Sequence, residues 1–99
     1  MHVPSAAIIE VAAVCARLTG KDERGIQAAD YIRERATVNY DSVLLNESIR
    51  VAVTARCSGF DSIFIACAIM TNSMLITDDK GMFDAARKVG VACKLLRDM

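Results

Sequence analysis

The chain has 99 residues, and its twelve basic and twelve acidic side chains give a formal net charge of zero. A chain of this length forms one domain with one modest core, and its balanced charge excludes a general attraction to nucleic acids or membranes. Hydrophobic residues make up 54% of the chain, while aromatic residues make up 5% and proline occurs once. This composition is typical of a helix-rich globular domain over residues 1–99 and excludes a disordered chain.

Charged residues interrupt every apolar run before it reaches the roughly 20 residues that a membrane span needs. The first apolar segment contains Glu10 and has no basic residue before it, so it does not look like a signal peptide. We therefore expect a cytoplasmic protein with no membrane contact.

The cysteines are dispersed, with no C-x-x-C pair, and the only histidine is His2, which argues against a zinc site. Free cysteines are usually buried, so core thiols are the main expectation. Disulfides, as in a secreted or a hyperthermophile protein, are the alternative. The four residues concerned are Cys15, Cys57, Cys67 and Cys93.

The first part of the chain predicts two helices followed by a strand. Residues 4–18 are apolar on nearly every side and predict a mostly buried helix that ends near Gly20. Residues 22–36 predict an amphipathic surface helix, which Gly25 weakens slightly. Residues 37–41 are short and β-prone, and predict an edge strand.

The second part predicts three helices and two strands. Residues 47–59 predict a helix with Asn46 as its cap and Gly59 as its terminator, and residues 60–72 predict an almost wholly apolar helix. A buried strand over 73–77, an amphipathic helix over 80–90 and a last strand over 91–96 follow. The order helix, strand, helix, strand predicts a parallel pair with a right-handed crossover.

Several acids lie in apolar surroundings or at a strand end. Glu10 and Asp61 are each isolated in an apolar helix, where partial burial requires a cation, a metal ion or a proton. Asp78 and Asp79 follow the strand over 73–77, and ligands collect at the carboxyl ends of parallel strands. Each acid also has an ordinary explanation, because acids cap helices and favour their first turns.

Together, these acids could converge on one oxygen-rich pocket suited to Mg²⁺ or Mn²⁺. Such an ion activates water and holds phosphate oxygens, which is the chemistry of phosphodiester hydrolysis. The basic residues that could contact phosphates are equally well explained as a solvated surface. They are Arg50, Arg56, Lys80, Arg87, Lys88, Lys94 and Arg97.

Two long segments resemble a known family. They are VPSAAIIEVAAVCARL (residues 3–18) and GFDSIFIACAIMTNSMLITDDKGMFDAARKVGVACKLL (residues 59–96). The second has an acid that opens an alanine-rich helix, then a short strand, then Thr-x-Asp, then another helix. With the helix between them, these segments resemble the PIN domain, in particular the VapC-type toxin ribonucleases. The resemblance implies an α/β class with a three-layer α/β/α arrangement and a short parallel sheet.

The resemblance also implies a site and partners. It places the catalytic metal ligands at Glu10, Asp61 and Asp79, with Thr77 and Asp78 as auxiliary residues. It implies an endoribonuclease that uses Mg²⁺ or Mn²⁺, acts on RNA, forms homodimers or higher oligomers, and is silenced by an antitoxin protein. The alternative is a non-catalytic binding or oligomerisation module with the same fold.

The family's first strand, which ends in an acid, has no counterpart before the helix that carries Glu10. We therefore expect an N-terminally truncated PIN-like domain, whose activity that loss would threaten. A misassigned start, a shortened chain and natural degeneration all remain open. A partner's strand could cover the exposed sheet edge.

Overall fold

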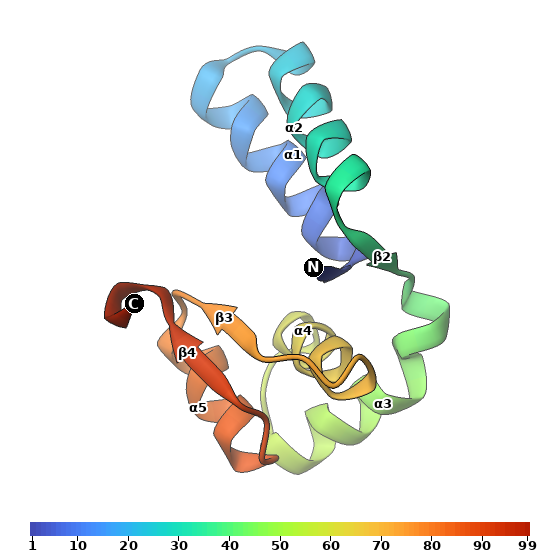
Figure 1. The fold of residues 1–99 in the computed structure, drawn as a ribbon, viewed down its shortest axis with the longest axis vertical. Helices are drawn as coiled ribbons and strands as arrows, with labels where there is room; N and C mark the ends of the chain where they lie inside the picture. The colour runs from blue at the N-terminus through green and yellow to red at the C-terminus, as the bar shows by residue number, and fades with distance from the viewer. The chain divides into compact units, whose positions relative to one another are not determined.

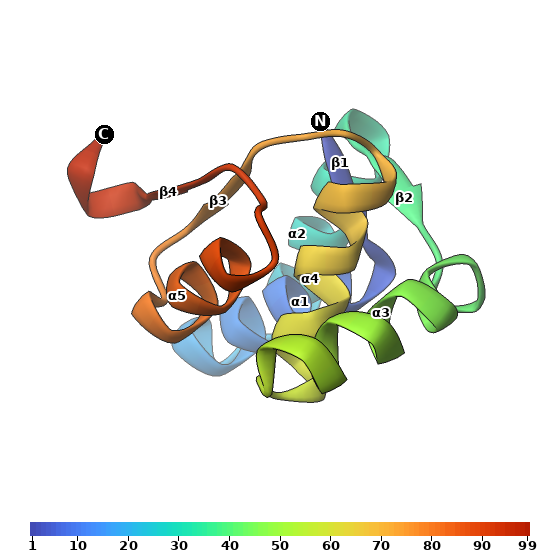
Figure 2. The ribbon, with the colours of Figure 1, turned by 90° about the horizontal axis from the view of Figure 1, so that it is seen from below.

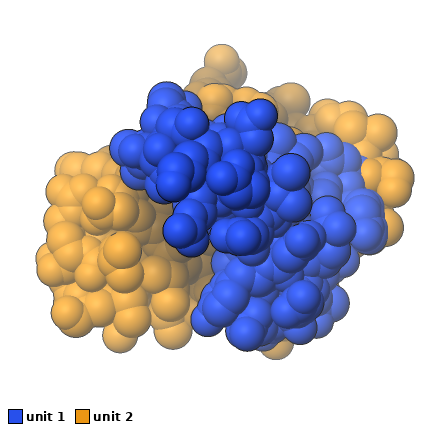
Figure 3. Space-filling view, turned by 90° about the horizontal axis from the view of Figure 1, so that it is seen from above, with its two compact units in different colours: residues 1–41 blue, residues 42–99 orange.

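The computed structural model describes residues 1–99, which form five α-helices, four short strands and one 3₁₀ turn. The chain divides into two compact units, unit 1 (Met1–Asp41) and unit 2 (Ser42–Met99), coloured in Figure 3. Both units contain a parallel pair of strands, so the expected α/β class with short parallel sheets is confirmed. The single domain and the three-layer arrangement concern both units together and stay predictions.

Unit 1 is a helical hairpin with a strand at each end. Helix α1 (Ser5–Thr19) follows strand β1 (His2–Pro4), and helix α2 (Asp22–Arg35) leads into strand β2 (Thr37–Asn39). The end of α1 at Gly20 is confirmed, because Gly20 has the left-handed φ of 70° that glycine tolerates best. Strand β2 is also confirmed, but its parallel partner β1 was not expected.

The two helices of unit 1 lie side by side (Figure 1). Gly25 of α2 is buried at their contact. A Cβ atom built on Gly25 would lie 2.6 Å from the backbone oxygen of Ala12 and 3.1 Å from the Cβ atom of Ala16. Gly25 therefore lets the backbones of α1 and α2 approach closely, and this packing offsets its poor helix propensity.

Helix α3 (Asp41–Ala55), which belongs to unit 2 from Ser42 onward, starts earlier than expected. Asn46 lies inside this helix, so its assignment as a cap is wrong. The buried residues recur at helical spacing from the first turns onward, which explains the earlier start. They are Leu44, Ser48, Val51 and Ala55.

The boundary between α3 and helix α4 (Gly59–Met70) also differs from expectation. Gly59 begins α4, whereas α3 stops at Ala55 and Arg56 takes the left-handed φ of 54°. At the other end of α4, Asn72 has a φ of 51°, and asparagine tolerates this conformation better than most residues.

The rest of unit 2 follows the predicted order. Strand β3 (Leu75–Thr77), helix α5 (Lys80–Lys88) and strand β4 (Cys93–Leu95) lead to the 3₁₀ turn η1 (Leu96–Asp98). The parallel pairing of β3 with β4 is confirmed, with Thr77 opposite Leu95. Helix α5 packs against both strands (Figure 2).

The core of unit 2 is contributed by its three helices and β3. Val51 of α3, Ile65 of α4 and Ala86 of α5 are fully buried, with 0% of their surface exposed. All four cysteines are free thiols; Cys67 is buried, and the other three, Cys15 among them, are only half-buried. No single helix is long and apolar enough to cross a membrane; α3 and α4 reach such a length and composition only as a pair, bent by 116° at its break.

Candidate metal centre

Asp79 lies where β3 gives way to α5, at the carboxyl end of the strand. It is the N-cap of α5, and its Oδ1 accepts a hydrogen bond from the backbone N–H of Met82 at 3.1 Å. The backbone N–H of Asp79 donates to Thr77 Oγ1 at 3.1 Å. The capping explanation is therefore correct for Asp79, but the cap uses only one of its two carboxylate oxygens.

Asp61 occupies the first turn of α4. Its backbone N–H donates to the hydroxyl of Ser58, the N-cap, at 3.1 Å. The pattern Ser58-x-x-Asp61 is a capping-box spacing with aspartate in place of glutamate. Sequence reasoning missed Ser58, although this spacing is visible in the sequence.

Asp61 and Asp79 interact electrostatically. Burial raises the pKa of Asp61 above its ordinary value, and the negative charge of Asp79 raises it further, while a hydrogen bond with Ser58 acts in the opposite direction. Burial also raises the pKa of the neighbouring Cys57 thiol, and the charge of Asp61 adds to that effect. A carboxylate whose pKa is raised by a neighbouring negative charge is stabilised in its ionised form by a nearby cation.

Asp78 points to a different partner. The guanidinium of Arg97, in η1, donates from Nε to Asp78 Oδ1 at 3.2 Å and from Nη2 to the Asp78 backbone oxygen at 2.7 Å. These neighbouring acids therefore have separate roles: Asp79 caps α5, and Asp78 is attached to the C-terminal turn. No local pattern indicated this contact, since 19 positions separate Arg97 from Asp78.

Glu10 lies on α1 in unit 1 and is exposed. The expectation that it would be partly buried is wrong, because α1 belongs to a hairpin with few buried side chains. Its membership in a metal site with Asp61 and Asp79 stays a prediction. Within each unit, no three His, Cys, Asp or Glu side chains form a group that could hold a metal ion.

The donor set of unit 2 suits a hard divalent cation. Asp61 and Asp79 offer carboxylate oxygens only, and Mg²⁺ is commonly bound by one or two carboxylates while it keeps several waters. Burial and the charge of Asp79 both raise the pKa of Asp61, and a bound cation would oppose both effects. The chemistry of the residues therefore fits Mg²⁺ or Mn²⁺.

Several of the basic residues are already paired with acids. Arg50 pairs with Glu47 one turn earlier in α3, and Lys80 pairs with Asp84 in α5 at 3.9 Å. Lys88 lies near enough to Cys57 to lower the pKa of its thiol, against the larger effect of burial. The charges of Lys88 and Asp61 therefore both act on the pKa of the Cys57 thiol.

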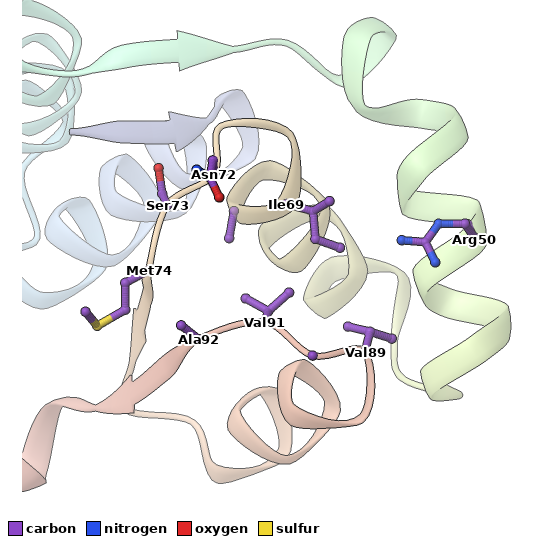
Figure 4. Close-up of a pocket in the computed structure, with 10 residues that line it drawn as sticks. Arg50, Ile69, Asn72, Ser73, Met74, Val89, Val91 and Ala92 are labelled. Carbon is purple, nitrogen blue, oxygen red and sulfur yellow. The ribbon is translucent and has the colours of Figure 1, made fainter.

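A cavity of about 440 Å³ lies elsewhere in unit 2 (Figure 4). Its lining comes from the segments that precede β3 and β4, including Asn72 and Val91, and from Arg50 of α3. It therefore opens at the amino ends of the strands, whereas Asp79 lies at the carboxyl end of β3. None of the candidate metal ligands lines it.

Unit 2 is thus a parallel α/β unit with Asp79 at the carboxyl end of β3 and Asp61 in the first turn of α4. The family model of the PIN domain matches residues 1–88, so the chain belongs to the PIN domain family. This family is of nuclease type, and its members typically use a divalent metal ion. No curated protein and no solved structure matches the chain.

Proposed function

We propose that this chain is a Mg²⁺- or Mn²⁺-dependent endoribonuclease of the VapC toxin type, with Asp61 and Asp79 as metal ligands. The observation that carries the proposal is the proximity of two acids from different elements: Asp61, in the first turn of α4, lies near enough to Asp79, the N-cap of α5, for the charge of Asp79 to raise its pKa. Glu10 is the third proposed ligand.

The residues around the pair have separate tasks in this proposal. Asp79 presents the carboxylate oxygen that its helix cap leaves over, and Asp61 presents its carboxylate from the first turn of α4. Thr77 Oγ1 accepts the Asp79 N–H, so its own proton stays available to orient a water or a phosphate oxygen. When bound, the ion supplies Lewis-acid activation of water and of the phosphodiester.

The proposed partners follow from the same site. RNA is the proposed substrate, and Lys88 is a candidate phosphate contact because of its position near Cys57. A homodimer, an antitoxin that masks the acids and a cytoplasmic location complete the proposal for a VapC-type toxin.

RNA cleavage with and without a divalent ion tests the proposal. The wild-type chain should cut RNA with Mg²⁺ or Mn²⁺ and stop when EDTA removes the ion. Asp79→Asn keeps a good N-cap but removes the charge, so it isolates the metal-binding role. Asp61→Asn and Asp79→Asn should each lower the cleavage rate by more than the roughly 10–100-fold that loss of an outer-shell residue costs.

Asp84→Asn is the matched control, since Asp84 is an exposed acid of α5 whose partner is Lys80. It should cut at the wild-type rate. Cleavage that persists in EDTA, or that survives both site variants, contradicts the proposal.

A non-catalytic binding module is the second candidate. It is favoured by one observation: within unit 2, no third His, Cys, Asp or Glu side chain joins Asp61 and Asp79 in a group that could hold a metal ion. A folded chain that binds no Mn²⁺ at millimolar concentration and cuts no RNA would establish this alternative.

A further inference from the structure

We propose that Arg97 is a positioning residue for the metal centre: it fixes the peptide group between Asp78 and Asp79 and so directs the Asp79 carboxylate. This inference rests on the proposed function, because it concerns how the same centre is held together. The family match ends at residue 88, so it does not extend to Arg97.

Both ends of the peptide group between Asp78 and Asp79 are held. Its oxygen accepts a hydrogen bond from Arg97 Nη2 at 2.7 Å, and its N–H donates to Thr77 Oγ1 at 3.1 Å. A peptide group is planar, so fixing its oxygen and its N–H fixes the orientation of the whole plane. That plane places the Cα atom of Asp79, and the start of α5, where Asp79 is the N-cap with a φ of −93°, sets the remaining rotation that directs its Cα–Cβ bond.

Arg97 also holds the Asp78 side chain. Its Nε donates to Asp78 Oδ1 at 3.2 Å, so one guanidinium contacts the side chain and the backbone of the same residue. The rigid, planar fork of arginine allows this double contact, whereas the single ammonium of lysine offers one point of charge. The contact therefore requires arginine in particular.

The position of Arg97 follows from the sheet register. Thr77, the last residue of β3, pairs with Leu95, the last residue of β4. The turn η1 then carries Arg97 back to the loop that leaves β3. A residue of the turn after β4, Arg97, therefore contacts the loop after β3, and this contact adds Arg97 to the residues of the proposed site.

Positioning and simple electrostatics predict opposite results. Arg97 is a cation near a proposed cation site, so on charge alone its removal should tighten Mn²⁺ binding. If its role is to position Asp79, its removal should weaken Mn²⁺ binding although a repulsive charge is lost. Exposed ion pairs contribute little to stability, so variants of Arg97 are expected to fold.

Isothermal titration with Mn²⁺ distinguishes the two roles. Arg97→Ala and Arg97→Lys should both weaken Mn²⁺ binding by roughly tenfold, the lower end of outer-shell effects. Lys94→Ala, which removes an exposed cation of β4, is the matched control and should bind as the wild type does. Unchanged or tighter binding in both Arg97 variants overturns the proposal.

Amide hydrogen exchange without metal separates a failure of this inference from a failure of the proposed function. The Asp79 N–H should exchange several-fold faster in both Arg97 variants, while the Leu75 N–H, which donates to Ala92 across the sheet, should not change. If the wild type binds no Mn²⁺, the proposed metal-dependent function is wrong. The exchange rates then decide by themselves whether Arg97 holds the peptide group between Asp78 and Asp79. Equal Asp79 protection in wild type and variants overturns the positioning role.

Discussion

Units 1 and 2 are built in different ways. Unit 2 has a core of buried, mostly aliphatic side chains from its helices and β3, and Asp61 and Asp79 lie at the starts of two of these helices, α4 and α5. Unit 1 is a hairpin whose helices touch through small residues around Gly25, and most of its side chains are exposed or half-buried. The acid in the packed unit has a perturbed pKa, while the acid on the hairpin, Glu10, is exposed.

This difference shows what makes an isolated acid informative. Glu10 and Asp61 look alike in the sequence, since each is the only acid of an apolar helix. The pKa of Asp61 is raised by burial and by the charge of Asp79. The first two predictions change the packing of each unit separately, and the next two test the acid pair.

Removing a core side chain of unit 2 should have the largest effect. Ile65→Ala deletes a fully buried side chain and leaves a cavity, so it should lower the free energy of unfolding by about 2–5 kcal/mol. Urea denaturation measures this loss. Val53→Ala on the exposed side of α3 is the control, with an expected change within about 0.5 kcal/mol; equal losses in the two variants would refute the assigned core.

Filling the contact between α1 and α2 should have the next largest effect. In Gly25→Ala, the new methyl group meets the Ala12 backbone, so the variant should lose about 1–3 kcal/mol of stability despite alanine's better helix propensity. Thermal unfolding followed by circular dichroism measures it.

Gly59→Ala is the matched control for Gly25→Ala. No atom lies within 4 Å of the Cβ position of Gly59, and its conformation does not require glycine. Its stability should rise slightly or stay unchanged. A stabilised Gly25→Ala protein would show that the two helices of unit 1 are not closely packed.

Asp61→Asn should change how stability depends on pH. The raised pKa of Asp61 means that the folded protein keeps this proton at pH values where the unfolded chain has lost it. Raising the pH from the ordinary pKa of 3.8 through the folded value therefore lowers the free energy of unfolding of the wild type.

Without metal and near neutral pH, Asp61→Asn should thus be more stable than the wild type by up to about 0.5 kcal/mol. Urea titrations of both proteins between about pH 4 and pH 7 give the free energy of unfolding of each at every pH. The difference between wild type and variant isolates the contribution of the Asp61 carboxyl group. If Asp61→Asn is less stable than the wild type at neutral pH, and the difference in their free energies of unfolding does not change as the pH falls, the assigned environment of Asp61 is wrong.

Gly81→Ala should have the smallest effect. A Cβ at Gly81 would lie 3.1 Å from Asp79 Oδ1, so the carboxylate must shift by a few tenths of an ångström. Mn²⁺ binding should weaken by about threefold, equivalent to roughly 0.7 kcal/mol, while the helix gains propensity. Stronger Mn²⁺ binding by Gly81→Ala would show that the position of the Asp79 carboxylate does not require the absence of a Cβ atom at residue 81.

Much of this structure follows from local sequence patterns. The order of elements from α4 to β4 and the position of Asp79 before α5 were predictable, because turn residues and apolar periodicity mark them. The start of α3 was also within reach, since its buried residues recur at helical spacing from Leu44.

The remaining features depend on contacts between distant positions. Strand β1 has three residues and exists through its pairing with β2, with His2 opposite Thr37. The contact of Arg97 with Asp78 depends on the register of β3 with β4. Local propensity does not indicate which distant residues pair. The β1–β2 pairing and the Arg97–Asp78 contact therefore could not be predicted from residue type alone.

Calorimetric titration of Mn²⁺ into the wild type, Asp61→Asn and Asp79→Asn tests the central claim most directly. The paired carboxylates predict saturable binding to the wild type at millimolar or lower concentration, loss of that binding in both site variants, and wild-type binding in Asp84→Asn. Wild-type affinity retained in Asp61→Asn and Asp79→Asn, or no binding to a folded wild-type chain, would contradict a metal centre built on this pair.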